Sequence, residues 1–293
     1  MQTETNWISA YIFHDISFEK VLIELLKPFI EKLEKKDYVS TFFFIRYWED
    51  GPHVRLRLLP KNSQNKAHII SLLKTTVKLF FDECSLVSSY RLEFKDYVRE
   101  IERYGGKVNI IEAEKIFEIS SRTILDIIDD NYNNWDYSLA ISYAIQIHLV
   151  LAKLLFKNDL NTMISFFQKV YSNWFYYSIK IDETEKKVDD EVKKINLAFE
   201  ESYNKQNTVI NNMIKYLLQE KIEVSISTKW FLESNLIDNN YYSFKNCDDL
   251  TLFAIYDSLI HMTNNRLGIY LRDESFIAFL IFNGLIKYKN SLS

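Results

Sequence analysis

Proline and glycine are both scarce in this sequence of 293 residues. There are only three prolines, Pro28, Pro52 and Pro60, and only five glycines. Proline interrupts a helix and glycine weakens one, so long stretches without either are typical of helical structure. The part of the chain that follows Pro60 is therefore expected to be largely helical.

Cysteine is almost absent as well. Cys84 and Cys247 lie far apart and form no Cys-x-x-Cys motif. This pattern indicates neither a disulfide framework nor a zinc site, and it favours a reducing cytoplasm. The sequence also has no glycine-rich phosphate loop, no dinucleotide-binding fingerprint and no histidine or cysteine ligand spacing. We therefore expect no metal, nucleotide or flavin cofactor.

Long apolar runs and an excess of basic charge are also missing. The first residues, MQTETNWISA, lack the basic and apolar regions of a signal peptide, and no apolar run approaches the ~20 residues that span a bilayer. The net charge is −4 and the pI is about 5.8, which argues against direct binding of nucleic acid. We expect a cytoplasmic protein without a membrane span.

Hydrophobic and aromatic residues, in contrast, are plentiful. They make up 47% and 15% of the chain, with 21 Phe and 19 Tyr. Such a composition is typical of a globular protein with a large core. The aromatic residues suit either this core or a peptide-binding groove, and we favour the core.

The first hundred residues alternate between strand and helix patterns. Strands are predicted at residues 7–14, 38–47, 53–60 and 86–98. Helices are predicted at 17–36, with a kink or break at Pro28, and at 66–81. The order strand, helix, two strands, helix, strand predicts a split βαβ unit with a largely antiparallel sheet.

The remainder of the chain shows only helical periodicity. Helices are predicted at 110–130, 137–156, 159–178, 183–220, 248–263 and 272–288. The double glycine Gly105-Gly106 divides the β-rich part, residues 1–107, from the helical part, residues 108–293. No repeat or low-complexity linker separates the two parts. We therefore predict an α+β fold in a single domain covering residues 1–293.

A strand with two different faces is the first candidate for a functional site. In HVRLRLLP, His53, Arg55 and Arg57 alternate with apolar residues, so the three share one face. A solvated sheet face with ion pairs is one interpretation. The other is a site for a carboxylate, oxyanion or phosphate, because guanidinium groups bind these anions in a bidentate manner.

Two further clusters contain candidate residues. In REIERYGG, Arg99 and Arg103 flank two acids, and the glycines that follow allow a tight turn. In SLIHMTNNRLG, His261 lies near the end of a predicted helix, one turn after Asp257, which is spaced to hold its imidazole. Taken alone, each cluster also suits a purely structural role.

The four stretches together resemble a known family. WISAYIF, FFFIRYWEDGPHVRLRL, REIERYGG and IHMTNNRLG are similar, in the same order, to the small domain of class I lanthipeptide dehydratases. Thiopeptide-type bacteriocin biosynthesis proteins share this domain. The resemblance covers residues 7–286. In that family a large domain transfers glutamate from glutamyl-tRNA to Ser or Thr of a precursor peptide, and the small domain then eliminates the glutamate. These 293 residues are too few to contain the large domain as well, so we expect a separate glutamylating protein.

The resemblance also implies roles for individual residues. Arg55 and Arg57 match the family's Arg-x-Arg pair, His261 matches its histidine, and the third arginine is Arg103 or Arg99. Fixed guanidinium groups suit a reaction in which charge develops on an enolate and on a leaving carboxylate, and a histidine suits proton transfer. The residues around them are expected to bind substrate: Arg46, His53, Tyr104, Asn265 and Arg266.

Three functions remain open at this point. The first is a glutamate-eliminating lyase that acts on a glutamylated precursor peptide, in trans with a separate glutamylating protein. The second is the cycloaddition that closes the pyridine ring of thiopeptides, which stand-alone members of the family perform. The third is a binding module for the peptide or for the glutamylating protein. The oligomeric state is also open, and a homodimer is one of the states allowed.

Overall fold

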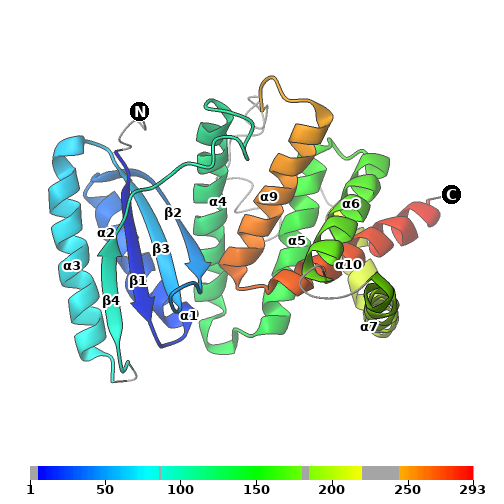
Figure 1. Ribbon diagram of the computed structural model, residues 1–293, viewed down its shortest axis with the longest axis horizontal. Helices are drawn as coiled ribbons and strands as arrows, with labels where there is room; N and C mark the ends of the chain where they lie inside the picture. The colour runs from blue at the N-terminus through cyan, green and yellow to red at the C-terminus, as the bar shows by residue number, and fades with distance from the viewer. Residues whose placement is uncertain (1–5, 86, 180–184, 220–243, 293) are drawn as a thin grey trace. The chain divides into compact units, whose positions relative to one another are not determined.

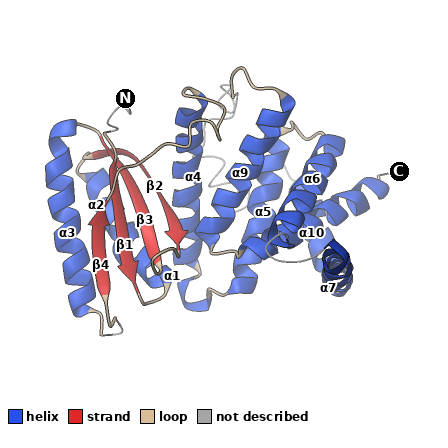
Figure 2. Ribbon diagram, viewed as in Figure 1, coloured by secondary structure: helices blue, strands red, loops and turns tan. Residues whose placement is uncertain are grey.

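The computed structural model describes residues 6–85, 87–179, 185–219 and 244–292. It forms two compact units. Unit 1 comprises Met1–Trp135 and Phe244–Arg266, and unit 2 comprises Asp136–Ser243 and Leu267–Ser293. The sheet belongs to unit 1, and the described part of unit 2 is built from helices (Figure 2).

The sheet has the predicted antiparallel topology. Its strands are β1 (Ile8–His14), β2 (Val39–Tyr47), β3 (His53–Pro60) and β4 (Tyr90–Phe94), in the order β2-β3-β1-β4. Every neighbouring pair is antiparallel. Each helical connection thus passes over a strand, as in a split βαβ unit, and the α+β prediction is confirmed.

β4 is shorter than the predicted strand at residues 86–98. It ends at Phe94, and beyond it the chain turns towards helix α4 (Asn109–Asp130). Arg99 donates two hydrogen bonds of 2.7 Å to the carboxylate of Glu114 in α4, and the same carboxylate raises the pKa of the nearby Tyr97. These contacts draw the segment away from the sheet, and the sequence pattern of a strand does not reveal them.

The first helical segment is irregular before Pro28. It consists of α1 (Phe18–Lys20), a π-helical turn η1 (Val21–Leu26) and α2 (Lys27–Lys35), and Ser17 caps its N-terminus. Proline has no N–H group to donate to the turn before it, and a π turn shifts the preceding hydrogen bonds by one residue. The Lys27 N–H accordingly bonds to the Leu22 carbonyl. The predicted break is therefore present, in the turn that leads into Pro28.

One face of the sheet is covered by helices. It carries residues that are fully buried, among them Ala10, Ile12, Val54 and Leu56. Contacts from α3 (Lys66–Glu83) and α1 reach this face. Phe81 stacks on Tyr90, with ring centroids 4.6 Å apart, and Phe18 packs against His14. The apolar side of β3 therefore faces the helix-covered core, and His53, Arg55 and Arg57 point to the opposite side.

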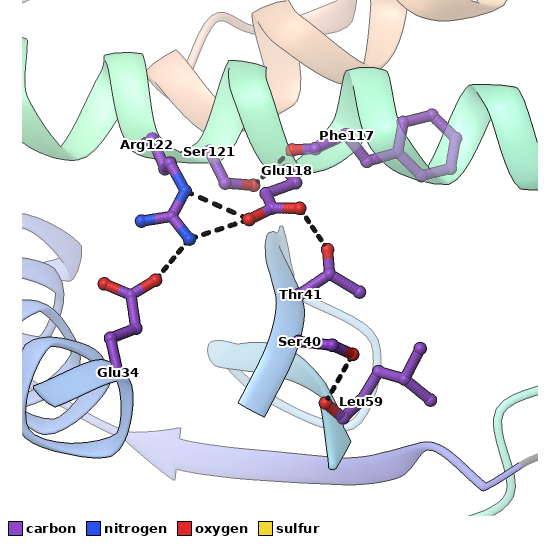
Figure 3. A network of polar contacts seen from close by, with 8 residues as sticks. All are labelled: Glu34, Ser40, Thr41, Leu59, Phe117, Glu118, Ser121 and Arg122. Carbon is purple, nitrogen blue, oxygen red and sulfur yellow. Dashed lines mark hydrogen bonds and ion pairs between the residues drawn. The ribbon is translucent and has the colours of Figure 1, made fainter. Parts of the chain in front are cut away.

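Helix α4 lies beside the edge strand β2, and α9 (Asp249–Leu267) packs against α4 (Figure 1). Arg122 in α4 bonds to Glu118 and reaches Glu34 of α2, while Glu118 accepts a hydrogen bond from Thr41 of β2 (Figure 3). These contacts attach α4 to strand β2 of the sheet and to helix α2.

Unit 2 contains α5 (Tyr137–Leu155), α6 (Leu160–Ile179), α7 (Glu185–Gln219) and α10 (Leu271–Asn290). Helix α10 packs against the other three. Gly284 allows α10 to approach α7 closely, because a Cβ atom at this position would lie 2.2 Å from Cδ1 of Ile214. The six helices predicted after residue 107 are all present, and their ends differ by a few residues from those predicted.

Candidate functional site

His53, Arg55 and Arg57 lie side by side on the face of the sheet that carries Tyr11 and Tyr47. In the register of the sheet, His53 pairs with Phe13 and Tyr47, Arg55 with Tyr11 and Ile45, and Arg57 with Ser9 and Phe43. The alternation in HVRLRLLP is thus realised as predicted. The aromatic neighbours come from the same alternation in β1 and β2, and the sequence analysis did not single them out.

Cations concentrate around the ring of Tyr11. The guanidinium carbons of Arg55 and Arg57 lie 4.8 and 5.0 Å from the ring centroid, and the Lys95 ammonium lies 4.8 Å from it. Arg55 also stacks on Tyr47 at 3.3 Å. Aromatic faces stabilise nearby cations but do not neutralise them.

Two acids offset part of the positive charge on this face, since Lys95 forms an ion pair of 3.1 Å with Glu93 and Arg55 one of 3.8 Å with Glu49. Arg57 has no acidic partner among the described residues, and its charge favours an anionic ligand.

Arg57 is the most deeply buried of these cations. Only 5% of it is exposed, and burial lowers its pKa. Its Nη2 donates to the Tyr11 hydroxyl at 3.3 Å, whereas its Nη1 has no hydrogen-bond partner among the described residues. A buried guanidinium is normally paired with an acid, because burying a charge alone is costly. No ion pair between Arg57 and an acid occurs in the described part of the chain.

His53 is held as a neutral imidazole. Its Nδ1 bonds to the Gly51 carbonyl at 2.8 Å, and its Nε2 accepts a hydrogen bond of 3.0 Å from Nε of Arg55. A carbonyl requires a donor at Nδ1, and Arg55 requires an acceptor at Nε2, so the proton lies on Nδ1. Burial lowers the pKa of His53, and the charge of Arg55 acts in the same direction. His53 therefore orients Arg55.

Acid is expected to destabilise unit 1 through His53 and His14. Burial also lowers the pKa of His14. Unfolding lets both residues bind protons that the folded state excludes, so the stability they contribute is complete above about pH 6.5 and is lost as the pH falls below it. The slope of the unfolding free energy against pH approaches about 1.4 kcal/mol per pH unit for each histidine.

Urea unfolding between pH 5 and pH 8 measures this slope. His53→Gln is expected to flatten it, and His68→Gln, at an exposed position on α3, is the matched control. An unchanged slope in His53→Gln would show that His53 is not kept neutral by the fold.

The two arginines of REIERYGG have different surroundings. Arg99 is held by the buried Glu114 through its bidentate ion pair. Arg103 is more exposed, and its Nε donates a hydrogen bond of 3.0 Å to the Ser258 hydroxyl on α9. Ser258 and His261 are three residues apart and therefore lie on one side of this helix. The structure thus brings Arg103 to the part of α9 that carries His261.

Glu114 also links Arg99 to the cationic face. Tyr97 lies near this carboxylate, and its pKa is raised by burial and by the charge of Glu114. The guanidinium carbon of Arg57 lies 5.4 Å from the centre of the Tyr97 ring. Tyr97 and Glu114 were missed in the sequence analysis, because no local pattern relates them to β3. Tyr104, in turn, is 2% exposed and packs against Phe117 of α4.

Three residues predicted to bind substrate lie at the edge of β2 instead. The Asn265 side-chain amide exchanges two hydrogen bonds with the backbone of Arg46, at 2.9 and 2.8 Å, as a neighbouring strand would. The Arg46 guanidinium is buried on the helix-covered face and bonds to Glu19 and to the Arg266 carbonyl. Arg266 is fully buried and bonds to the Phe44 carbonyl. The structure therefore does not bring Arg46 to the face of Arg55 and Arg57.

The described residues contain no group of three or more His, Cys, Asp or Glu side chains arranged to hold a metal ion. Cys84 and Cys247 form no disulfide. Among the described helices, none is long and apolar enough to cross a bilayer.

Comparisons with known proteins agree with this architecture. Residues 7–283 match the sequence profile of the lantibiotic biosynthesis dehydratase C-terminal family. The Nisin biosynthesis protein NisB of Lactococcus lactis subsp. lactis is 24% identical over 280 residues, which cover 92% of this chain and 24% of NisB. This chain thus spans about a quarter of the length of that relative.

Several solved structures have a similar fold. The pyridine synthase TbtD from thiomuracin biosynthesis superposes with a TM-score of 0.67 at 8% identity, covering 97% of this chain and 99% of TbtD. The tRNA-dependent lantibiotic dehydratase MibB from Microbispora sp. 107891 gives a TM-score of 0.58 at 14% identity, covering 99% of this chain and 29% of MibB. At these identities the likeness concerns the fold alone. On the strength of the match over residues 7–283, the chain belongs to the lantibiotic biosynthesis dehydratase C-terminal family.

Proposed function

We propose that this chain is a lyase that eliminates glutamate from glutamylated Ser and Thr residues of a precursor peptide, leaving dehydroalanine or dehydrobutyrine. Family membership supports a role in the biosynthesis of ribosomally made peptide antibiotics. The glutamate is attached beforehand by a separate glutamylating protein that uses glutamyl-tRNA. This chain acts in trans on the glutamylated peptide, in the cytoplasm, and without a cofactor.

The observation that carries this proposal is the cationic face around Arg57. Arg57 is 5% exposed and has no acidic partner among the described residues, and Arg55 and Lys95 lie around the same tyrosine ring. Keeping such a charge buried is costly, and the cost is recovered when an anion binds. The glutamyl group carries one free carboxylate, a second carboxylate develops as the Cβ–O bond breaks, and negative charge also develops on the peptide carbonyl.

The elimination needs one proton transfer and one bond cleavage. A base removes the Cα proton, its electron pair forms the Cα=Cβ double bond, and the Cβ–O bond breaks as glutamate leaves with a carboxylate charge. Arg55 and Arg57 stabilise the developing charges, and His261 carries the proton. Arg103 is the third arginine of the site, because it bonds to Ser258 on the helix of His261 and its ion pair is with the exposed Glu100, whereas Arg99 is held by the buried Glu114. The reaction consumes no oxidant or reductant.

Mass spectrometry of a glutamylated peptide incubated with the purified protein tests the proposal. We expect each modified residue to lose one glutamate and to become a dehydroamino acid. His261→Asn, which removes proton transfer but keeps a polar side chain, is expected to slow the reaction at least about a hundredfold. Arg272→Gln, at a side chain that is 80% exposed on α10, is the control and is expected to react like the wild type.

The outcomes separate the remaining functions. An unchanged glutamylated peptide would refute elimination. If a peptide that already carries two dehydroalanines were then cyclised by the same protein, the function would be pyridine formation. If neither peptide were changed but the precursor bound tightly, the chain would be a binding module.

A further inference from the structure

Three buried hydrogen-bonding groups on the cationic face have no partner among the described residues. They are Nε1 of Trp7, Oγ of Ser9 and Nη1 of Arg57. The three residues are 4%, 3% and 5% exposed, respectively. Buried polar atoms are nearly always paired, so a group of unpaired ones requires an explanation.

The three groups are neighbours. Ser9 and Arg57 are paired across β1 and β3, a register that brings their Cβ atoms to about 5 Å of each other. Trp7 precedes Ser9 by two residues, so it lies on the same face. The rings of Trp7 and Tyr97 are 5.5 Å apart, and Arg57 lies 5.4 Å from the same Tyr97 ring. The ring of Tyr97 therefore lies next to both Trp7 and Arg57.

The chemistry of the three groups defines the ligand. An indole N–H and a guanidinium N–H only donate hydrogen bonds, and a serine hydroxyl donates one. A single water can satisfy all three groups, because the serine hydroxyl can also accept a hydrogen bond from it, but a water leaves the buried charge of Arg57 without a counter-charge. A carboxylate accepts at about four lone-pair positions and also neutralises the buried charge of Arg57. The group therefore fits one carboxylate, held on the floor of the cationic face.

We propose that Trp7, Ser9 and Arg57 bind the free side-chain carboxylate of the glutamyl group, an inference that rests on the proposed function. Transfer from glutamyl-tRNA joins the α-carboxyl to the peptide, so the side-chain carboxylate stays free. The Cα atoms of Arg55 and Arg57 are about 6.6 Å apart along the strand, and the two carboxyl carbons of glutamate are about 5 Å apart. With its side chain bound at Arg57, the glutamyl group presents its ester to Arg55, which His53 orients.

A binding experiment tests the three donors without requiring catalysis. The indole N–H resonances of the ¹⁵N-labelled protein are followed during titration with L-glutamate, with glutarate and with the uncharged glutaramide. We expect the Trp7 resonance, identified by its absence in Trp7→Phe, to shift saturably with both carboxylates and not with glutaramide. Trp48, whose ring packs on Phe18, is the internal reference. A Trp7 resonance that stays unchanged, or shifts equally with glutaramide, would overturn the proposal.

Kinetics on the glutamylated peptide then distinguish the two carboxylates. The side-chain carboxylate is charged throughout the reaction, so Ser9→Ala and Trp7→Phe are each expected to raise KM about tenfold with kcat nearly unchanged. Ser40→Ala, at an exposed serine whose hydroxyl bonds to the Leu59 carbonyl, is the matched control. A fall in kcat with KM unchanged would assign the donors to the leaving carboxylate and refute this assignment. Absence of any elimination by the wild type would refute the proposed function alone, because the titration still tests the binding of a carboxylate.

Discussion

Arg57→Met is expected to slow glutamate elimination by about a hundredfold to a thousandfold and, at the same time, to make the fold more stable. The kinetic effect follows from the position of Arg57 at the centre of the cationic face, where it contacts the rings of Tyr11 and Tyr97. Loss of a single fixed donor to a developing anion has an effect of this size. Methionine retains the length of the side chain and removes the charge.

The gain in stability follows from the environment of Arg57. Its only hydrogen bond to another described residue is the long contact of 3.3 Å with Tyr11, and burial lowers its pKa. The folded protein therefore holds a poorly paired charge out of water. Replacing buried charges by apolar side chains of similar volume stabilises proteins by about 1–4 kcal/mol, and we expect a value near the lower end. Stability that is sacrificed in this way is typical of functional sites.

Two measurements check this prediction together. Urea unfolding gives the change in stability, and the mass-spectrometric assay gives the change in rate. The matched control is Arg91→Met, an arginine on β4 that stacks on Phe13 with its side chain 54% exposed. It is expected to alter neither quantity strongly. If Arg57→Met were less stable than the wild type, Arg57 would be a structural residue, and the argument for an anion site would fail.

The local part of the fold could be predicted from the sequence because it depends on period and on turn residues. β3 spans residues 53–60, as predicted from HVRLRLLP, and the break near Pro28 follows from the missing N–H of proline. The same alternation identified the face of Arg55 and Arg57. The alternation of WISAYIFH likewise places Ser9 and Tyr11 on one face of β1. A serine and a tyrosine in a strand, however, carry no functional signal by themselves.

The remainder of the site depends on contacts between segments that are distant in the sequence. Tyr97 and Glu114 support the cationic face only because the chain after β4 turns towards α4. Arg46 was predicted to bind substrate because it belongs to the same motif as Arg55. In the sheet, however, Arg46 pairs with Val54, and its side chain therefore points to the helix-covered face. A register of this kind becomes visible only when the strands are assembled.

Arg266 shows how a second buried arginine can serve the fold. Its Nε donates to the Phe44 carbonyl at 2.9 Å and to Ser121 at 3.0 Å, and its Nη1 donates to the Met262 carbonyl at 2.9 Å. It therefore joins β2, α4 and α9. Burial lowers the pKa of Arg266 to about 9, so the side chain remains charged at neutral pH. Compared with Arg57, Arg266 makes several short hydrogen bonds to backbone and hydroxyl oxygens, and these atoms would lose their donor if it were removed.

Arg266→Met is accordingly expected to destabilise unit 1 by about 3 kcal/mol, the opposite of the effect of the same substitution at Arg57. The Phe44 carbonyl would stay buried without its donor, and the edge of β2 would lose its attachment to α9. Amide hydrogen exchange at Phe44 and Arg46, whose N–H groups donate to Ser121 and Asn265, is expected to accelerate about a hundredfold. Arg272→Met on α10 is the control, since its side chain is 80% exposed. Equal exchange rates in Arg266→Met and the wild type would mean that Arg266 does not hold this edge. Only the rate of glutamate elimination would then distinguish Arg57→Met from Arg266→Met.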